Sequence, residues 1–482
     1  MSIATDFSMR VRSALIWRSG TQIVAQLISW GSTLAVIRIL EPGDYGVFAM
    51  TQAVLVFLSF LNGYGLASSI IQSEKVDPLR LRQAFGALLQ ILLAPYAAEY
   101  FRQPIIADLL RVQALIFLAT PFIVLPEALM ARNLEFKKTA LVNLLSAIVG
   151  AVVALTSAMN GLGVWTLVYA ALAIFWTQAI GLFLSARMFI WPSFDFRGAK
   201  QMFTFGGTVL LAHVFWTIQS QSDIFIASRS LSIHELGLYA EALFLTTIFT
   251  AKFVPPLNEI AFPAYSRIQD DPGAVRWSFL KAVRLIMLIA CPIYFGMAVT
   301  AQELVHVVLG KKWIGMAPIV AVLALVMPLM TLQILFAPAN NALGRPQISA
   351  RVTMFGAVVM PLAFMIGVNF GVMGLAYAWV AGFPLLTVFT FQQSYKHLGI
   401  SAGDIARALW PGLSTSLAMA VIVYLANNIL PEMLIYARLG VLLAIGGAIY
   451  LGLLYAVARP TFDEVIQFIM HRKSPEQPQD SI

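Results

Sequence analysis

One lysine lies inside an otherwise apolar stretch of the chain. Lys252 falls near the middle of residues 237–262, and Pro255 and Pro256 follow it closely. Ionisable groups are costly inside a membrane, so they usually face a partner or a water-filled cavity. The two prolines remove backbone donors and favour a bend there. We therefore predict that Lys252 lines a cavity and contacts substrate; a structural ion pair between helices is the alternative.

A second polar group follows one helical face. His213, Trp216, Ser220 and Asp223 recur every three or four residues within 203–228, a spacing that places them on one side of a helix. Asp223 is the strongest candidate for substrate contact, and Trp216 is a weaker one. Packing against neighbouring helices explains the uncharged members equally well.

Other charged residues suggest coupling and gating. Glu241 lies at a depth similar to that of Asp223, and two carboxylates there could bind Na⁺ or H⁺. An ion pair with Arg229 is the alternative. Glu127 and Glu259 lie near cytoplasmic helix ends, where a structural or gating role is expected.

Arginines occur near the ends of apolar segments. Arg18 is about one turn into the first segment, where it either extends to the cytoplasmic surface or binds a phosphate group through its guanidinium fork. Arg38 precedes Asp44 as Arg229 precedes Glu235. We predict that these two pairs form outer-loop caps or links of a gate.

Several classes of chemistry have no counterpart in the sequence. The five His residues are scattered, the single Cys excludes an intrachain disulfide, and no P-loop, dinucleotide fingerprint or nucleophile triad occurs. We predict that the chain is not an enzyme, that it binds no metal or cofactor, and that it does not use ATP by itself.

The composition indicates the elements that must position these residues. Of the 482 residues, 60% are hydrophobic and 11% are charged, against about 25% charged in average soluble proteins. The charges cluster between apolar runs that are long enough to cross a bilayer. This excludes a soluble enzyme, a disordered chain and a secreted disulfide scaffold. Basic cytoplasmic loops explain the net charge of +8 better than nucleic-acid binding does.

The sequence predicts an all-α integral membrane protein with about 14 transmembrane helices. The third is short and contains Pro95. The first is read as a retained span, because no signal-peptide cleavage site follows it. The predicted spans are 14–37, 45–71, 83–99, 109–130, 139–158, 163–186, 203–228, 237–262, 282–300, 316–338, 350–368, 373–393, 406–427 and 437–457.

The distribution of Lys and Arg predicts the topology. With both termini cytoplasmic, 23 of the 31 basic residues fall on the inner side and seven on the outer side, and Lys252 lies in mid-span. This bias follows the positive-inside rule. No loop is long enough to form a soluble domain.

An internal duplication divides the chain. RILEPGDYGVFA at 38–49 matches RSLSIHELGLYA at 229–240, and GVWTLVYA at 163–170 matches GVMGLAYA at 371–378. Independent turn chemistry is the alternative explanation. We predict two parallel six-helix lobes, a plan in which transporters hold substrate between the halves. The predicted domains are 1–190 (N-lobe), 191–400 (C-lobe), 401–460 (two further helices) and 461–482 (a cytoplasmic tail).

Four segments carry a family resemblance that extends over nearly the whole chain: RILEPGDYGVFA, SDIFIASRSLSIHELGLYAEA at 222–242, FPAYSRIQDD at 262–271 and NNALGRPQISARV at 340–352. The sequence resembles the O-antigen and exopolysaccharide flippases of the Wzx and WzxC type, within the multidrug/oligosaccharidyl-lipid/polysaccharide exporter superfamily. The resemblance implies two six-helix lobes around a central cavity, often with two extra helices. The short third span departs from the family's full-length helix.

The resemblance also implies a function. Such proteins move polyprenyl-diphosphate-linked oligosaccharides from the inner to the outer leaflet of a bacterial inner membrane. Lys252 and Arg18 would then meet the diphosphate, and Trp216 a sugar. The expected partners are the lipid-linked oligosaccharide, membrane lipid and other polysaccharide assembly proteins. A cation-coupled drug antiporter of the same superfamily is one alternative. A membrane-embedded polysaccharide polymerase or ligase is another, although the outer loops are short for it.

Overall fold

The computed structural model describes residues 3–58, 78–132, 136–186, 199–457 and 459. Within these ranges the side chains of 3–19, 78–88 and 199–212, and some near 125–136, lie outside the description. The described residues form α-helices with short 3₁₀ turns, and no strand occurs among them. The all-α prediction is confirmed.

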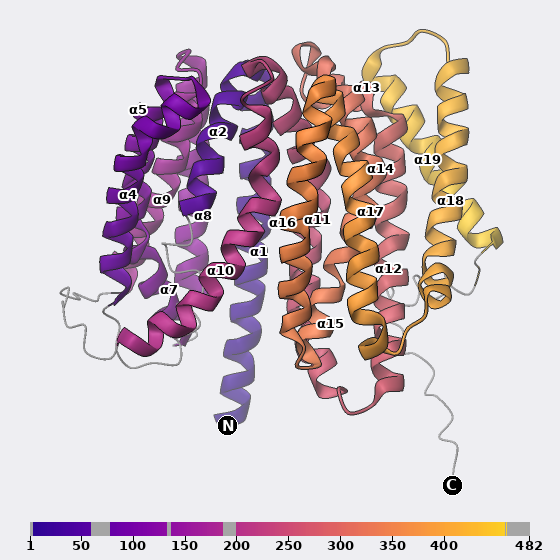
Figure 1. Cartoon of the computed structure of the whole chain (residues 1–482), viewed down its shortest axis with the longest axis horizontal. Helices are drawn as coiled ribbons and strands as arrows, with labels where there is room; N and C mark the ends of the chain where they lie inside the picture. Colours follow the sequence, from indigo (N-terminus) through magenta and orange to yellow (C-terminus); the bar gives the residue numbers. More distant parts are fainter. Residues whose placement is uncertain (1–2, 59–77, 133–135, 187–198, 458, 460–482) are drawn as a thin grey trace. The chain divides into compact units, whose positions relative to one another are not determined.

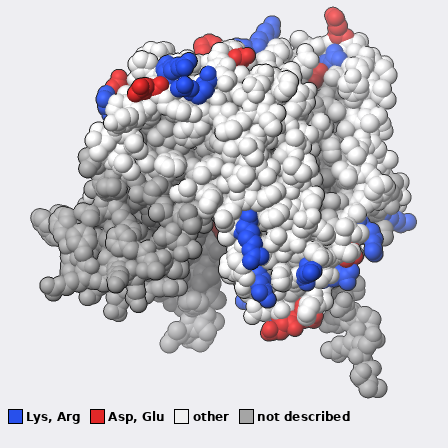
Figure 2. Space-filling model, viewed as in Figure 1, with Lys and Arg blue, Asp and Glu red and all other residues white. Residues whose placement is uncertain are grey.

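The helices are long and apolar enough to span a membrane. Ten stretches of the described residues meet that standard, and one of them, Pro346–Leu398, covers two predicted spans. Since helices satisfy their own backbone groups, they are suited to cross lipid in this way. The chain is a multi-pass membrane protein. Figure 2 shows Lys, Arg, Asp and Glu near the helix ends of the C-terminal half, with a band of other residues between them.

Each of the fourteen predicted spans meets a helix, although some predicted ends are wrong. The chain packs as two compact units, Met1–Ala240 and Glu241–Ile482. The predicted domain ends at 190, 400 and 460 follow the repeat rather than this packing, and they stay predictions. The cytoplasmic tail at 461–482 lies outside the described residues.

The first unit contains the helices drawn from indigo to magenta in Figure 1. Within it α1 packs on α8, α8 on α9, α4 on α5, and α2 on α10. Its helices are α1 (Ile3–Ile39), α2 (Pro42–Leu58), α4 (Pro78–Phe101), α5 (Ile105–Gln113), α6 (Leu115–Ala119), α7 (Pro121–Arg132), α8 (Phe136–Met159), α9 (Trp165–Ala186), α10 (Ala199–Ala227) and the start of α11 (Ile233–Arg267).

Two predicted spans of this unit differ from expectation. The short third span is instead α4, a continuous helix of 24 residues that runs through Pro95, about 36 Å long at 1.5 Å per residue. That length is sufficient to cross a bilayer. The fourth span is divided into α5, α6 and α7, with interruptions at Ala114 and Thr120.

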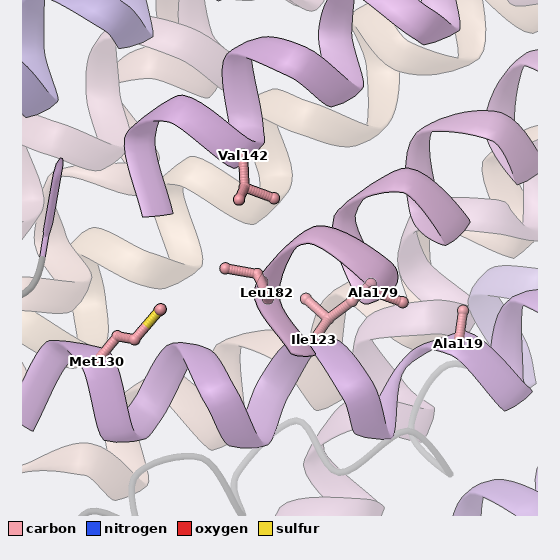
Figure 3. Close-up of a cluster of buried hydrophobic side chains, with 6 residues drawn as sticks. All are labelled: Ala119, Ile123, Met130, Val142, Ala179 and Leu182. Carbon is pink, nitrogen blue, oxygen red and sulfur yellow. The ribbon is translucent and has the colours of Figure 1, made fainter. Parts of the chain in front are cut away.

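A cluster of buried apolar side chains packs four helices of this unit together. Figure 3 shows Ala119, Ile123, Met130, Val142, Ala179 and Leu182, which come from α6, α7, α8 and α9 and are all buried. Ala119 and Ala179 allow the backbones to approach, and packing between such surfaces replaces the hydrophobic drive that is absent between helices in lipid.

The second unit contains the remaining helices. Within it α12 packs on α14 and α18, α17 on α14 and α16, and α19 on α13 and α18. Its helices are the rest of α11, α12 (Pro272–Val299), α13 (Ala301–Val308), η2 (Lys311–Met316), α14 (Ala317–Ile334), α15 (Phe336–Ala342), α16 (Pro346–Gly367), η3 (Val368–Phe370), α17 (Gly371–Leu398), α18 (Ala402–Ile429) and α19 (Ile435–Val457).

A carboxylate at each end holds the hairpin of α18 and α19 to the rest of this unit. At one end Arg276 of α12 pairs with Asp404 of α18 at 2.8 Å. At the other end Glu303 of α13 accepts a hydrogen bond from Asn427 at 3.0 Å and lies 3.6 Å from Arg438. The last two helices are therefore part of the C-terminal unit.

Replacing Glu303 with alanine is expected to lower the free energy of unfolding by about 2–3 kcal/mol, because it removes the acceptor of the Asn427 amide and the carboxylate that pairs with Arg438. Glu303 is 6% exposed. Thermal denaturation in detergent measures the effect. The control is Asp108→Ala, which removes an exposed pair with Arg111 and should change stability by less than about 1 kcal/mol. Equal losses in the two variants would contradict this.

Candidate functional site

The C-terminal half of α11 carries the predicted lysine on an exposed surface. Lys252 is exposed, and most residues from 251 to 264 are exposed with it. Lys252 lies 19 residues from the start of the helix and 15 from its end, so about 28 Å and 22 Å of helix flank it. A charge at such a depth needs water or a partner.

Prolines add polar backbone groups to the same surface. Pro255, Pro256 and Pro263 lie inside α11. A proline cannot donate to the carbonyl four residues earlier, so the carbonyls of 251, 252 and 259 lose their helical donors. Lipid cannot satisfy such groups, and this backbone is tolerated only against protein or water. The C-terminal half of α11 is therefore suited to line a hydrated cavity. The bend predicted at Pro255 stays a prediction.

Two charges of opposite sign share that face. Glu259, also exposed, follows Lys252 by seven residues, which places it on the same side of the helix about 10 Å further along. Phe253, Leu257 and Ile260, all exposed and apolar, lie beside that face, about 80–140° around the helix from Lys252. The helix thus presents a cation at mid-depth with an exposed apolar surface next to it.

Asp223 is the second candidate, and it belongs to the first unit. It lies near the C-terminal end of α10 and is 1% exposed. Tyr239 of α11 donates a hydrogen bond to its Oδ2 at 2.8 Å, and the backbone N–H of Ile224 donates to Oδ1 at 2.8 Å. The hydroxyls of Thr217 and Ser222, on the same helix, are buried and have no hydrogen-bond partner among the described residues. This part of α10 is polar and closed to solvent.

Asp223→Asn distinguishes a coupling role from a structural one. The amide keeps the size of the side chain and its bond with Tyr239 but removes the charge. If Asp223 binds a cation or proton during transport, glycan export should fall by about tenfold or more while the amount of protein in the membrane is unchanged. Export and immunoblotting of membranes measure the two quantities. Tyr239→Phe is the control for the hydrogen bond alone, and wild-type export by Asp223→Asn would exclude coupling.

The helix starts that follow the duplicated motif contact each other inside the first unit. A Cβ added to Gly46 of α2 would overlap the carbonyl oxygen of Ile233, and one added to Gly237 of α11 would overlap that of Pro42. Each added Cβ would also lie 3.1 Å from the backbone nitrogen of the other glycine. Gly46 and Gly237 are equivalent positions of the repeat, as are Pro42 and Ile233. The contact is therefore reciprocal, because each glycine meets the backbone of the residue equivalent to the one that the other glycine meets.

Both helix starts are capped in the same way. Asp44 accepts a hydrogen bond from the N–H of Glu41 at 3.1 Å, and Glu235 accepts one from the N–H of Ser232 at 3.0 Å. Glu41 and Ser232 are again equivalent positions. The carboxylates also favour the positive end of each helix. These caps fix the entry angles of α2 and α11 and allow the two glycines to meet.

The two arginines of the motif differ in their surroundings. Arg229 donates to the carbonyl of Tyr100 at 2.9 Å, and its guanidinium lies 5.3 Å from the centre of the Tyr100 ring. It therefore holds the start of α11 to the end of α4. Arg38 is exposed at the end of α1 and has an interaction partner.

The remaining predicted site residues are placed as follows. Trp216 is 49% exposed, and its ring centre lies 5.4 Å from that of His213. Glu241 is buried, at the first position of the second unit, and Glu127 is exposed on α7. Arg18 belongs to α1, but its side chain lies outside the description. The proximity predicted for Asp223 and Glu241, and the roles of all these residues, stay predictions.

Sequence reasoning missed Tyr239, Tyr100 and the glycine contact. The internal repeat contained a signal for Tyr239 and for the glycine contact. Tyr239 is equivalent to Phe48, and Asp223 is equivalent to Ser32. The second copy therefore contains both the carboxylate and the hydroxyl that binds it, at positions where the first copy has neither. Tyr100 has no such signal, because its contact with Arg229 joins residues 129 positions apart.

Comparison with known proteins identifies the family of the chain. A family model described as polysaccharide biosynthesis protein matches residues 35–318, more than half of the chain. The chain belongs to this family. The match covers the duplicated motif, Asp223 and Lys252, so the candidate site lies within the part that defines the family.

Curated relatives of this family are similar over most of their length. Lipopolysaccharide biosynthesis protein WzxC of Escherichia coli is 24% identical over 82% of this chain and 82% of its own. Succinoglycan biosynthesis transport protein ExoT of Rhizobium meliloti is 24% identical over 71% of each chain. A probable low-salt glycan biosynthesis flippase, Agl15 of Haloferax volcanii, is 24% identical over 84% of this chain and 90% of its own.

Solved structures share the fold at low sequence identity. A lipid II flippase, MurJ, in an inward closed conformation, has a TM-score of 0.73 at 11% identity and covers 95% of this chain and all of its own. An inward-facing multidrug resistance transporter of the MATE family has a TM-score of 0.60 at 13% identity, over 80% of this chain. The chain thus has the fold of these two proteins.

Proposed function

We propose that this protein is a flippase that moves polyprenyl-diphosphate-linked oligosaccharide, an O-antigen or exopolysaccharide repeat unit, from the inner to the outer leaflet. The observation that carries the proposal is Lys252, exposed on a proline-bearing helix face within the membrane. A diphosphate needs a cation inside the hydrated path, and Lys252 supplies one. The names of the curated relatives, which include a flippase and transport proteins for glycans, support the same substrate class.

The arrangement of α10 and α11 supports alternating access. Both helices are buried near their outer ends, at Asp223 and Tyr239, and exposed further inward, at Trp216 and Lys252. In the proposed cycle the head group enters from the cytoplasmic side while the polyprenyl chain stays in lipid. The helix starts at Gly46 and Gly237 then separate and release the glycan outside. The protein itself makes and breaks no covalent bond.

The proposal also includes the membrane, the partner proteins and the driving ion. The membrane is the bacterial inner membrane, which the family resemblance implies, and both chain termini lie in the cytoplasm, which the Lys and Arg bias supports. Other polysaccharide assembly proteins supply and consume the substrate. Na⁺ or H⁺ drives the cycle, with Asp223 and Glu241 as candidate coupling groups.

A leaflet assay tests the proposal. The purified protein is reconstituted into liposomes that contain a labelled polyprenyl-diphosphate oligosaccharide, and a glycosidase is added outside. About half of the label is accessible without flipping. Cleavage that rises toward completion with the wild type, but not with Lys252→Ala, is the expected result. Cleavage that stays at half for several glycans, with Na⁺ and H⁺ gradients imposed in turn, would contradict it.

A further inference from the structure

The C-terminal unit contains an apolar cavity of about 340 Å³ between α12, α13, α18 and α19. Ile293, Met419 and Leu443 form part of its wall, and the missing side chains of Gly296 and Gly447 leave space in it. In the predicted topology it lies in the outer half of the membrane. The proposed transport path does not use it.

The cavity is not suited to water. Its few polar groups already have partners: the hydroxyl of Thr300 donates to the carbonyl of Gly296 at 2.8 Å, and that of Tyr450 donates to the carbonyl of Leu288 at 2.6 Å. Apolar cavities without free polar groups stay dry. An empty cavity of this size would forfeit the packing contacts of its lining. The occupant must therefore be apolar.

The position of the cavity indicates which apolar molecule enters it. Ile293 and Leu443 are 41% and 57% exposed, so the mouth opens sideways between α12 and α19 toward lipid. The outer end is held by the contacts of Glu303, Asn427 and Arg438. If each methylene-sized group occupies about 30 Å³, which is the volume of a water molecule in the liquid, the cavity holds about eleven such groups. Bilayer phospholipids surround the mouth at far higher concentration than any substrate, and mass action favours them.

We propose that this cavity binds one acyl chain of a bilayer phospholipid, which packs α19 against α12. The chain replaces the side chains that Gly296 and Gly447 lack. Bound lipid therefore stabilises the hairpin of α18 and α19 on the C-terminal unit. The proposal depends on the membrane location of the chain and not on the identity of its glycan substrate.

Two glycines of α19 allow a matched test. Gly447 lines the cavity and Gly452 does not, and a Cβ at either position would meet no atom within 4 Å. Native mass spectrometry counts the phospholipid retained after purification in mild detergent. We expect wild type and Gly452→Leu to retain phospholipid and Gly447→Leu to retain about tenfold less, because the leucine side chain occupies part of the cavity and obstructs the acyl chain. Added phospholipid should raise the melting temperature of the first two proteins only.

Two results would overturn the proposal. Equal phospholipid retention in the three proteins would show that the lipid binds elsewhere. Preferential retention of polyprenyl phosphate, offered together with phospholipid, would assign the cavity to the substrate lipid instead. Flipping by Gly447→Leu is measured in parallel and is expected to remain near the wild-type rate. A wild type that fails to flip but retains phospholipid would contradict the proposed function and leave this inference intact.

Discussion

Replacing Lys252 with alanine is expected to abolish glycan export, by at least about a hundredfold, with an unchanged amount of protein in the membrane. The hydrated face of α11 would keep its free carbonyls but lose the only positive charge at mid-depth on that helix. The diphosphate would then cross without its counter-charge, and an uncompensated charge in a low-dielectric path costs several kcal/mol. Export from cells and cleavage in the leaflet assay measure the loss.

Two variants identify the charge as the cause. Lys252→Arg keeps the cation and should restore a substantial part of export, because guanidinium also binds phosphate. Phe253→Ala changes the neighbouring residue, which is exposed on the apolar side, and should export normally. If Lys252→Ala exported at the wild-type rate, Lys252 would have no role in substrate passage. If Phe253→Ala also lost export, the cause would be a disturbed helix rather than the missing charge.

A side chain at the glycine contact is expected to prevent the outer helix starts from packing. A Cβ on Gly237 would overlap the carbonyl of Pro42, and backbone atoms cannot move aside as a flexible side chain can. Gly237→Val and Gly46→Val should therefore hold α2 and α11 apart and reduce export by about tenfold or more. Gly43→Val is the control, because a Cβ there meets only Ile233, at 3.8 Å.

A labelling experiment distinguishes loss of the glycine contact from misfolding of the whole protein. Leu236, beside Gly237, is 0% exposed. A cysteine at that position should be protected from a membrane-impermeant maleimide outside the cell, and the Gly46→Val change should expose it. Unaltered protection together with lost export would show that the contact does not control outer access. Normal export by both valine variants would show that the contact does not open or close at all.

The fold could be predicted from the sequence because its strongest determinant is local. Apolar runs of about 20 residues indicate helices, and each predicted span meets one. The errors have tertiary causes. Pro95 reads as a helix breaker, yet α4 continues through it, since one lost hydrogen bond is tolerated within a long packed helix. The interruption at Ala114 has no neighbouring Gly or Pro to reveal it, whereas Pro121 directly follows Thr120 and marks the second interruption.

The site could be predicted in part, because an ionisable residue inside a membrane span is energetically unfavourable and therefore indicates a function. Lys252 and Asp223 stand out because charge is rare in apolar spans. The sequence does not tell which side of α10 is closed, so it could not predict that Asp223 is buried against Tyr239 while Trp216, seven residues away, is half exposed. The contact of Gly46 with Gly237 depends on how two helices cross, and it becomes visible only when the repeat is combined with the structure.

That glycine contact also restricts how the two halves of the chain can diverge. After a duplication, most positions of one copy are free to change without regard to the other, as Glu41 and Ser232, or Pro42 and Ile233, have done. Positions 46 and 237 touch, so a larger residue at either one meets the backbone of the other copy. A substitution at another position cannot remove this overlap, because main-chain atoms are present whichever residue stands there. The two copies are thus bound to evolve together at this point, while the segments around it drift apart.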